Sequence, residues 1–125
     1  MLKKLSLLLL LVFTVLPACT SVKSVDPELR RRAANLPILS PEDVEEQEYD
    51  VIGEVEGVSC ARQAGSNPSM EGARQELRIN AAEVGADAII NTFCEEGGVT
   101  FSRNCWKTIQ CRADAITWKE ETVEQ

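Results

Sequence analysis

Four cysteines within residues 60–111 limit most strongly how this chain can fold: Cys60, Cys94, Cys105 and Cys111. A small domain buries a smaller share of its apolar surface than a large one, so its core alone gives little stability. An even number of cysteines in a small exported domain is typical of a framework of disulfide bonds. The sequence therefore predicts a small domain held together by two disulfides.

The N-terminus predicts export from the cytoplasm. Lys3 and Lys4 precede an apolar run over residues 5–16, and small residues follow that run, which is the pattern of a cleavable signal peptide. The run is too short to span a bilayer, for which about 20 apolar residues are needed. We therefore expect residues 1–18 to be removed as a signal peptide.

Cys19 predicts a lipid anchor, because Leu16-Pro17-Ala18-Cys19 resembles the lipobox of bacterial lipoproteins. In those proteins the cysteine becomes the first mature residue and carries acyl chains, palmitate among them, which hold the protein on a membrane. Thr20 follows, and since an Asp at this position favours the inner membrane in enteric lipoproteins, Thr20 implies sorting to the outer membrane. The simpler alternative is an ordinary secretory signal with an incidental Cys19.

The composition excludes several classes of function. The chain has no histidine, which removes the commonest general base and metal ligand and any Ser-His-Asp or Cys-His arrangement. Its formal net charge of −7 argues against nucleic acid as a partner. The cysteines lack the CxxC spacing that is usual in zinc sites and in thiol-redox enzymes. We therefore expect no enzymatic activity, no cofactor and no metal site.

Residues 19–48 are interpreted as the lipidated N-terminus and a flexible tether. Pro27, Pro37 and Pro41 interrupt the segment, it is rich in charge, and few of its residues are suited to a core. The three arginines at positions 30–32 are interpreted as a solvated charge cluster, with binding to anionic lipid or lipopolysaccharide as the alternative. On this interpretation the segment lies outside the fold and adds nothing to its stability.

Residues 49–125 are expected to form the folded domain, of the α+β class. The pattern predicts one main helix over 68–84, with Asn67 as its N-cap and Gly85 just past its end. One apolar stripe is expected along this helix, formed by Met70, Ala73, Leu77, Ala81 and Val84. Alternating side chains predict three strands, over residues 49–59, 88–94 and 105–118. We therefore predict one main helix packed on a small three- to four-stranded sheet.

The last predicted strand has two different faces. Small and apolar side chains occupy one face, which should lie on the helix, and these are Cys105, Ile109, Cys111, Ala113 and Ala115. Trp106 and Trp118 belong to the opposite face. Two interpretations of these tryptophans stay open, since aromatic residues anchor partner proteins and also cover the second face of a sheet.

The spacing of the cysteines narrows their pairing. Cys105 and Cys111 lie on one predicted strand and are about 20 Å apart when it is extended, whereas a disulfide requires Cα atoms within about 7 Å. This excludes the Cys105–Cys111 bridge and, with it, Cys60–Cys94. Two schemes remain open: Cys60–Cys105 with Cys94–Cys111, or Cys60–Cys111 with Cys94–Cys105.

A family pattern runs through the domain. Four cysteines occur with nearly the family's spacing, together with Gly53-Glu54-Val55, Ser59-Cys60, Ala73-Arg74, Ile79-Asn80-Ala81 and the stretch 86–88. In these residues the chain resembles the RcsF family, outer-membrane lipoproteins that sense envelope stress for the Rcs phosphorelay of enteric bacteria. The resemblance covers about residues 49–119 and the lipoprotein signal. It implies a small α+β domain and, of the two open schemes, Cys60–Cys105 with Cys94–Cys111.

The resemblance also implies a function and partners. A domain that faces the periplasm, anchored in the outer membrane, would be held by barrel proteins or their assembly machinery, away from an inner-membrane inhibitor of the Rcs kinase relay. Envelope damage would free it to signal by protein–protein contact. The alternative is an accessory outer-membrane lipoprotein that binds envelope components or barrel proteins and does not signal.

Overall fold

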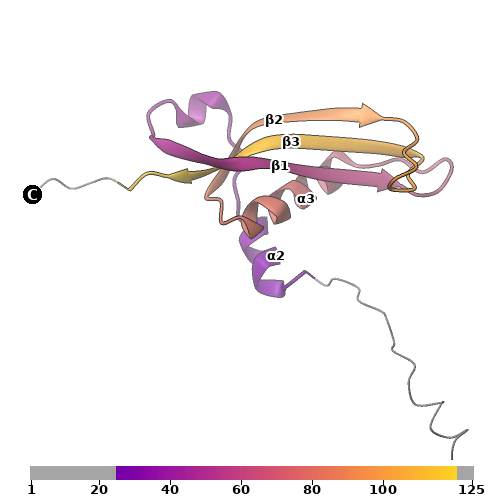
Figure 1. Cartoon of the computed structure of the whole chain (residues 1–125), viewed down its shortest axis with the longest axis horizontal. Coiled ribbons are helices and arrows are strands. Elements are labelled where there is room, and N and C mark those ends of the chain that lie inside the picture. The colour runs from indigo at the N-terminus through magenta and orange to yellow at the C-terminus, as the bar shows by residue number, and fades with distance from the viewer. Residues whose placement is uncertain (1–24, 121–125) are drawn as a thin grey trace, which may run out of the picture.

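The computed structural model describes residues 25–120, which form an α+β fold around a three-stranded antiparallel sheet (Figure 1). Along the chain the elements are α2 (Pro27–Ala34), the 3₁₀ helix η1 (Pro41–Val44), β1 (Tyr49–Ala61), α3 (Met70–Glu83), β2 (Ala88–Gly97) and β3 (Lys107–Trp118). Figure 1 shows α3 on one face of the sheet, with α2 beside one end of α3. The predicted fold class, one main helix on a small sheet held by two disulfides, is confirmed.

The sheet has the order β1-β3-β2, so the last strand of the chain lies in its centre. β3 pairs antiparallel with both neighbours, and each pairing contains one irregularity. In β1 it falls between Val51 and Gly53, and a glycine inside a strand is a common site for a bulge. In β2 it falls between Ile90 and Phe93, and Asn91, one of the residue types that tolerate positive φ, has a φ of 54° there.

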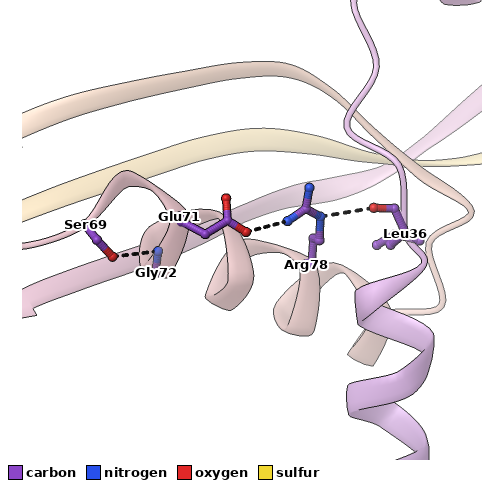
Figure 2. A network of polar contacts seen from close by, with 5 residues as sticks. All are labelled: Leu36, Ser69, Glu71, Gly72 and Arg78. Atoms are coloured by element: carbon purple, nitrogen blue, oxygen red, sulfur yellow. Dashed lines mark hydrogen bonds and ion pairs between the residues drawn. The ribbon is translucent and has the colours of Figure 1, made fainter.

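Helix α3 begins two residues later than its predicted start. Ser69 is the N-cap, since its hydroxyl oxygen accepts a 2.9 Å hydrogen bond from the Gly72 N–H (Figure 2). The prediction of Asn67 as the cap was wrong, because Ser69 lies three residues before Gly72 and so satisfies a free amide of the first turn. Gly85, with a φ of 80°, follows the C-cap Val84, as predicted.

The main core lies between α3 and the sheet. Ala73, Leu77 and Ala81 are fully buried. They pack with four of the five residues predicted for the inward face of the last strand, Ile109, Cys111, Ala113 and Ala115. The fifth, Cys105, was wrongly placed on this strand, because β3 begins only at Lys107. The two ends of the predicted apolar stripe are more exposed, at 40% for Met70 and 55% for Val84. Val84 was wrongly assigned to the stripe, because it is the C-cap, where the chain leaves the helical path. The core therefore rests on about two turns of α3.

A glycine in β1 lets α3 approach the sheet closely. A Cβ atom at Gly57 would overlap the Ala73 carbonyl oxygen and the backbone of Leu77, both in α3. Gly57 also lies opposite Cys111 of the central strand. Because the obstacles are backbone atoms, no rotamer change relieves the overlap, and any larger residue at position 57 must displace the helix.

Residues 25–48 are part of the fold, which corrects their interpretation as a flexible tether, whereas residues 19–24 lie outside the described part of the chain. Ala33, Leu36 and Val44 are buried. The backbone amide of Leu39 donates to the Ile89 carbonyl at 2.8 Å, and the Ile89 amide donates to the Pro37 carbonyl at 2.9 Å. The few apolar residues of the segment are thus placed to fill the core and to cover the edge of β2.

Two arginines join this segment to α3. The Arg32 guanidinium donates to the Ala82 carbonyl at 2.9 Å, in the last turn of α3, where cations are favoured. Arg78 of α3 donates through Nε to the Leu36 carbonyl at 3.2 Å, and its Nη1 lies 3.6 Å from a carboxylate oxygen of Glu71 (Figure 2). All three arginines of residues 30–32 are exposed, as a solvated cluster predicts, but Arg32 also bonds to α3, so the interpretation is incomplete for Arg32.

The second face of the sheet is covered at one end only. Val44 of η1 packs there with Ala88, Ile90 and Ile116, and Tyr49 and Trp118 lie against this cluster. The Ser40 backbone N–H and hydroxyl both donate to the Asp43 carboxylate, and these bonds hold the pKa of Asp43 below its ordinary value. The bonds close the turn of η1 and so present Val44 to the sheet.

Gly57→Ala should destabilise the domain, because the new methyl group overlaps the backbone of α3. We expect a loss of about 2 to 3 kcal/mol in the free energy of unfolding, measured by chemical denaturation. Gly98→Ala is the matched control, since a Cβ there meets no atom within 4 Å, and it should change stability by less than about 0.5 kcal/mol. Equal effects of the two substitutions would contradict the close approach of α3 to β1.

Leu36→Ala should also destabilise the domain, because Leu36 is only 8% exposed and belongs to the main core. The expected loss is about 2 to 3 kcal/mol in the same measurement. Val99→Ala, at an exposed position, is the control for removing apolar atoms and should be nearly neutral. If Leu36→Ala were as mild as Val99→Ala, the segment would lie outside the fold after all.

Candidate functional site

The Cys94–Cys111 disulfide crosses the sheet beneath the helix. These two residues are direct partners in the register of β2 and β3, and their Cα atoms are 4.0 Å apart. Cys111 is fully buried in the main core, where the Met70 sulfur lies 4.0 Å from its Sγ. This bridge therefore fixes an outer strand to the central strand inside the core.

The Cys60–Cys105 disulfide lies at the C-terminal end of β1, beside the loop that leads into β3. The Cα atoms of the two residues are 5.4 Å apart. Near this bridge the Trp106 amide donates to the Ala61 carbonyl at 2.8 Å, and Thr100 pairs with Cys105 in a short antiparallel bridge. Of the two schemes that spacing left open, the structure has the one implied by the resemblance.

Trp106 and Trp118, for which partner contact and cover of the second sheet face were both left open, do not form one site. Trp118 pairs with Tyr49 at the start of β1, and their rings meet edge to face with centroids 6.5 Å apart. The backbone of Trp106 bonds to Ala61, the last residue of the 13-residue strand β1. Trp106 therefore lies roughly 40 Å from Trp118, which pairs with the first residue of that strand. Trp118 therefore helps to cover the second face of the sheet, whereas Trp106 is 54% exposed.

The loop between β2 and β3 exposes further apolar side chains that the sequence did not single out. Phe101 is 95% exposed, and Val99 in the same loop is also exposed. With Trp106 they place three large apolar side chains on residues 98–106. Exposed aromatic residues are enriched where proteins bind one another, so this loop is a candidate contact region. The only sequence signal was an aromatic residue within a polar, glycine-containing segment.

A groove lies beside the Cys60–Cys105 bridge and has a volume of about 530 Å³. β1 contributes Val58 and Cys60 to its lining, and α3 contributes Glu76. Arg62 and Arg103, both with exposed side chains, complete the part of the lining that bears charge. Sequence reasoning missed this groove, because its residues come from three separate segments that only the fold brings together.

The polar groups on the open sheet face are engaged with one another. Glu56 accepts a 3.0 Å hydrogen bond from the Gln110 amide and forms a 3.0 Å ion pair with Arg112, all three on neighbouring strands. Within residues 25–120, no three His, Cys, Asp or Glu residues gather in a way that would hold a metal ion. All four cysteines of that range are in disulfides.

Cys19 and Thr20, the predicted acylation and sorting residues, lie outside the residues that the structure describes. Among the helices that it does describe, none is long and apolar enough to cross a membrane. Neither a protein-family model nor a curated protein matches the chain. The resemblance to the RcsF family therefore rests on the residues quoted from the sequence.

Removing the Cys60–Cys105 bridge should leave the domain marginally stable. The bridge closes a loop of 45 residues, for which the chain-entropy model gives a contribution of about 4 kcal/mol. The pair Cys60→Ala with Cys105→Ala should therefore lower the free energy of unfolding by that amount, and the matched pair at positions 94 and 111, with a separation of 17, by about 3 kcal/mol or more. Chemical denaturation measures both losses. Peptide mapping that linked Cys60 to Cys111, or found four free thiols, would contradict the pairing.

Proposed function

We propose that this protein is an outer-membrane lipoprotein of the RcsF type, which senses envelope stress and relays it to the Rcs phosphorelay by protein–protein contact. One observation supports this most: the Cys60–Cys105 and Cys94–Cys111 bridges, the pairing that the resemblance implied and that spacing alone did not select. In this proposal Cys19 carries the acyl chains and Thr20 directs the protein to the outer membrane. The domain faces the periplasm and acts without a cofactor.

The proposed partners are the ones that the family resemblance implies. Barrel proteins of the outer membrane, or their assembly machinery, hold the protein in unstressed cells. After damage, the domain contacts an inner-membrane inhibitor of the kinase relay. The exposed apolar loop over residues 98–106 supports a function in protein binding, because Phe101 and Trp106 offer apolar surface to a partner.

The packing of residues 25–48 limits where these contacts take place. If Cys19 is acylated, the stretch from Cys19 to Val25 spans about 20 Å at most when extended. A hydrocarbon core is roughly 30 Å thick, so a packed domain stays close to the inner surface of the outer membrane and meets a barrel from the periplasmic side. Release of the packed segment would lengthen the connection, at the cost of exposing Leu36 and Val44.

An accessory lipoprotein without a signalling function is the second candidate. The observation that favours it is the exposed apolar loop over residues 98–106. This loop could bind a barrel protein equally well if the protein never contacts an inner-membrane inhibitor. The two candidates differ in what happens when the domain is moved to the inner membrane, beside the proposed inhibitor.

Thr20→Asp should move the protein to the inner membrane and switch on a reporter of the Rcs regulon without stress, because the domain is then held beside the inhibitor. Membrane fractionation and reporter activity are measured in the same cells. Cys19→Ala is the companion variant, and it should abolish palmitate labelling and release the protein to the periplasm. A silent reporter with the protein in the inner membrane would reject signalling and favour the accessory candidate. Palmitate labelling of the Cys19→Ala variant would reject the lipid anchor.

A further inference from the structure

β1 is an outer strand, and part of its free edge is open. Asn80 of α3 donates through its side-chain amide to the Glu56 carbonyl at 2.6 Å, so this carbonyl points away from β3. The Ala61 carbonyl accepts from the Trp106 amide and points toward β3. Along an antiparallel strand the direction of the backbone groups alternates with each residue. The N–H and C=O groups of Val58 and Cys60 therefore point to the free edge.

These edge groups lack a protein partner in the described part of the chain. Within residues 25–120, no hydrogen bond from outside the sheet reaches the backbone of Val58 or Cys60. Exposed edges with unpaired backbone groups are templates for another strand, and natural proteins usually block them. At Glu56 the edge is blocked by Asn80, but beyond it the edge stays open as far as the end of β1.

The open edge coincides with the groove beside the Cys60–Cys105 bridge. Val58, Ser59 and Cys60 line this groove, so the unpaired backbone groups and the space next to them belong to one site. Gly72 and Glu76 of α3 line it as well. A volume of about 530 Å³ accommodates a short extended segment.

The charge at this site is opposite to that of the whole chain. Arg62 and Arg103 line the groove, their side chains are exposed, and neither forms an ion pair within residues 25–120. Glu76 is the one carboxylate among the lining residues, so the site has an excess of positive charge. The chain as a whole has a formal net charge of −7. Arginines in this position favour carboxylates, with which they form charge-assisted hydrogen bonds.

We propose that the free edge of β1 at Val58 and Cys60 binds an extended acidic segment of a partner protein, which adds a strand to the sheet and places its carboxylates on Arg62 and Arg103. Main-chain hydrogen bonds supply affinity in this mode of recognition, and the arginines supply selectivity. The inference deepens the proposed function, on which it rests for the claim that the protein signals by contact. A second copy is disfavoured as the occupant, because Asn80 blocks the edge at Glu56 and limits a symmetric pairing of two β1 strands to the few residues after it.

The test is a selection of peptides with the full chain, immobilised in detergent, as bait. The probe is a displayed library of random 12-residue peptides. Selected peptides should be enriched in Asp, Glu and β-branched residues and depleted in Pro. The charge-reversal bait Arg62→Glu with Arg103→Glu should lose this preference for acidic peptides and favour basic ones. The matched control is Arg74→Glu, an exposed arginine of α3 that does not line the groove, and it should select the same acidic peptides as the unchanged chain.

Two measurements on the best peptide then separate strand addition from charge attraction alone. Hydrogen exchange should slow at the amides of Val58 and Cys60 when the peptide is bound. Fluorescence anisotropy should give at least a tenfold weaker Kd for the charge-reversal variant and for a peptide N-methylated at alternate amides. No acidic enrichment, unchanged binding by the charge-reversal variant, protection confined to other strands, or dimers formed through β1 would each overturn the proposal. The selection needs no signalling, so a silent reporter in the Thr20→Asp strain rejects the proposed function without affecting this result.

Discussion

The rest of the domain depends on the contact between α3 and the sheet at Gly57 and Cys111. Gly57 has no side chain, so the backbone of α3 lies directly on β1. Beside it, Cys111 of the central strand is fully buried and bonded to Cys94. The small residues Ala73 and Ala81 keep the helix close, and Leu77 is the one large side chain among the fully buried residues of α3. A core of this size is small, and the two disulfides compensate by restricting the unfolded chain.

Residues 25–48, before β1, are part of this core and do not form a separate tether. Leu36 closes the main core, Val44 covers part of the second sheet face, and residues 37–39 bond to the start of β2. Arg32 and Arg78 fix the segment to α3 through backbone carbonyls. A lipid anchor at Cys19 would then hold a rigid body near the membrane instead of a domain on a long tether. The distance over which such a protein finds partners depends on whether this segment stays packed.

Two features suited to binding lie together at one end of the sheet, although apolar side chains such as Val51 and Phe93 are exposed elsewhere on it. The second face is covered near Trp118 and polar near Glu56, where Gln110 and Arg112 engage the carboxylate. At the other end lie Trp106, the loop with Phe101, and the groove beside Cys60–Cys105. That disulfide holds the loop against the end of β1, so both candidate binding features are positioned by one covalent bond. The arrangement suits recognition of a protein partner, because it offers exposed apolar area next to an open strand edge.

Local periodicity, together with residues such as Gly85 that end an element, predicted the fold class, the helix, the three strands and most of the inward face of β3. The sequence reduced the disulfide pairings to two and went no further, since the choice depends on which strand lies beside which. Contacts between distant segments placed Cys94 opposite Cys111, packed Leu36 and Val44 on the domain, and covered Trp118 while leaving Trp106 exposed. The groove lined by Val58, Glu76 and Arg103 could likewise not be predicted from the sequence. The physical reason is that strand register, close approach at Gly57 and burial of scattered apolar residues arise from contacts between distant parts of the chain, which local patterns do not encode.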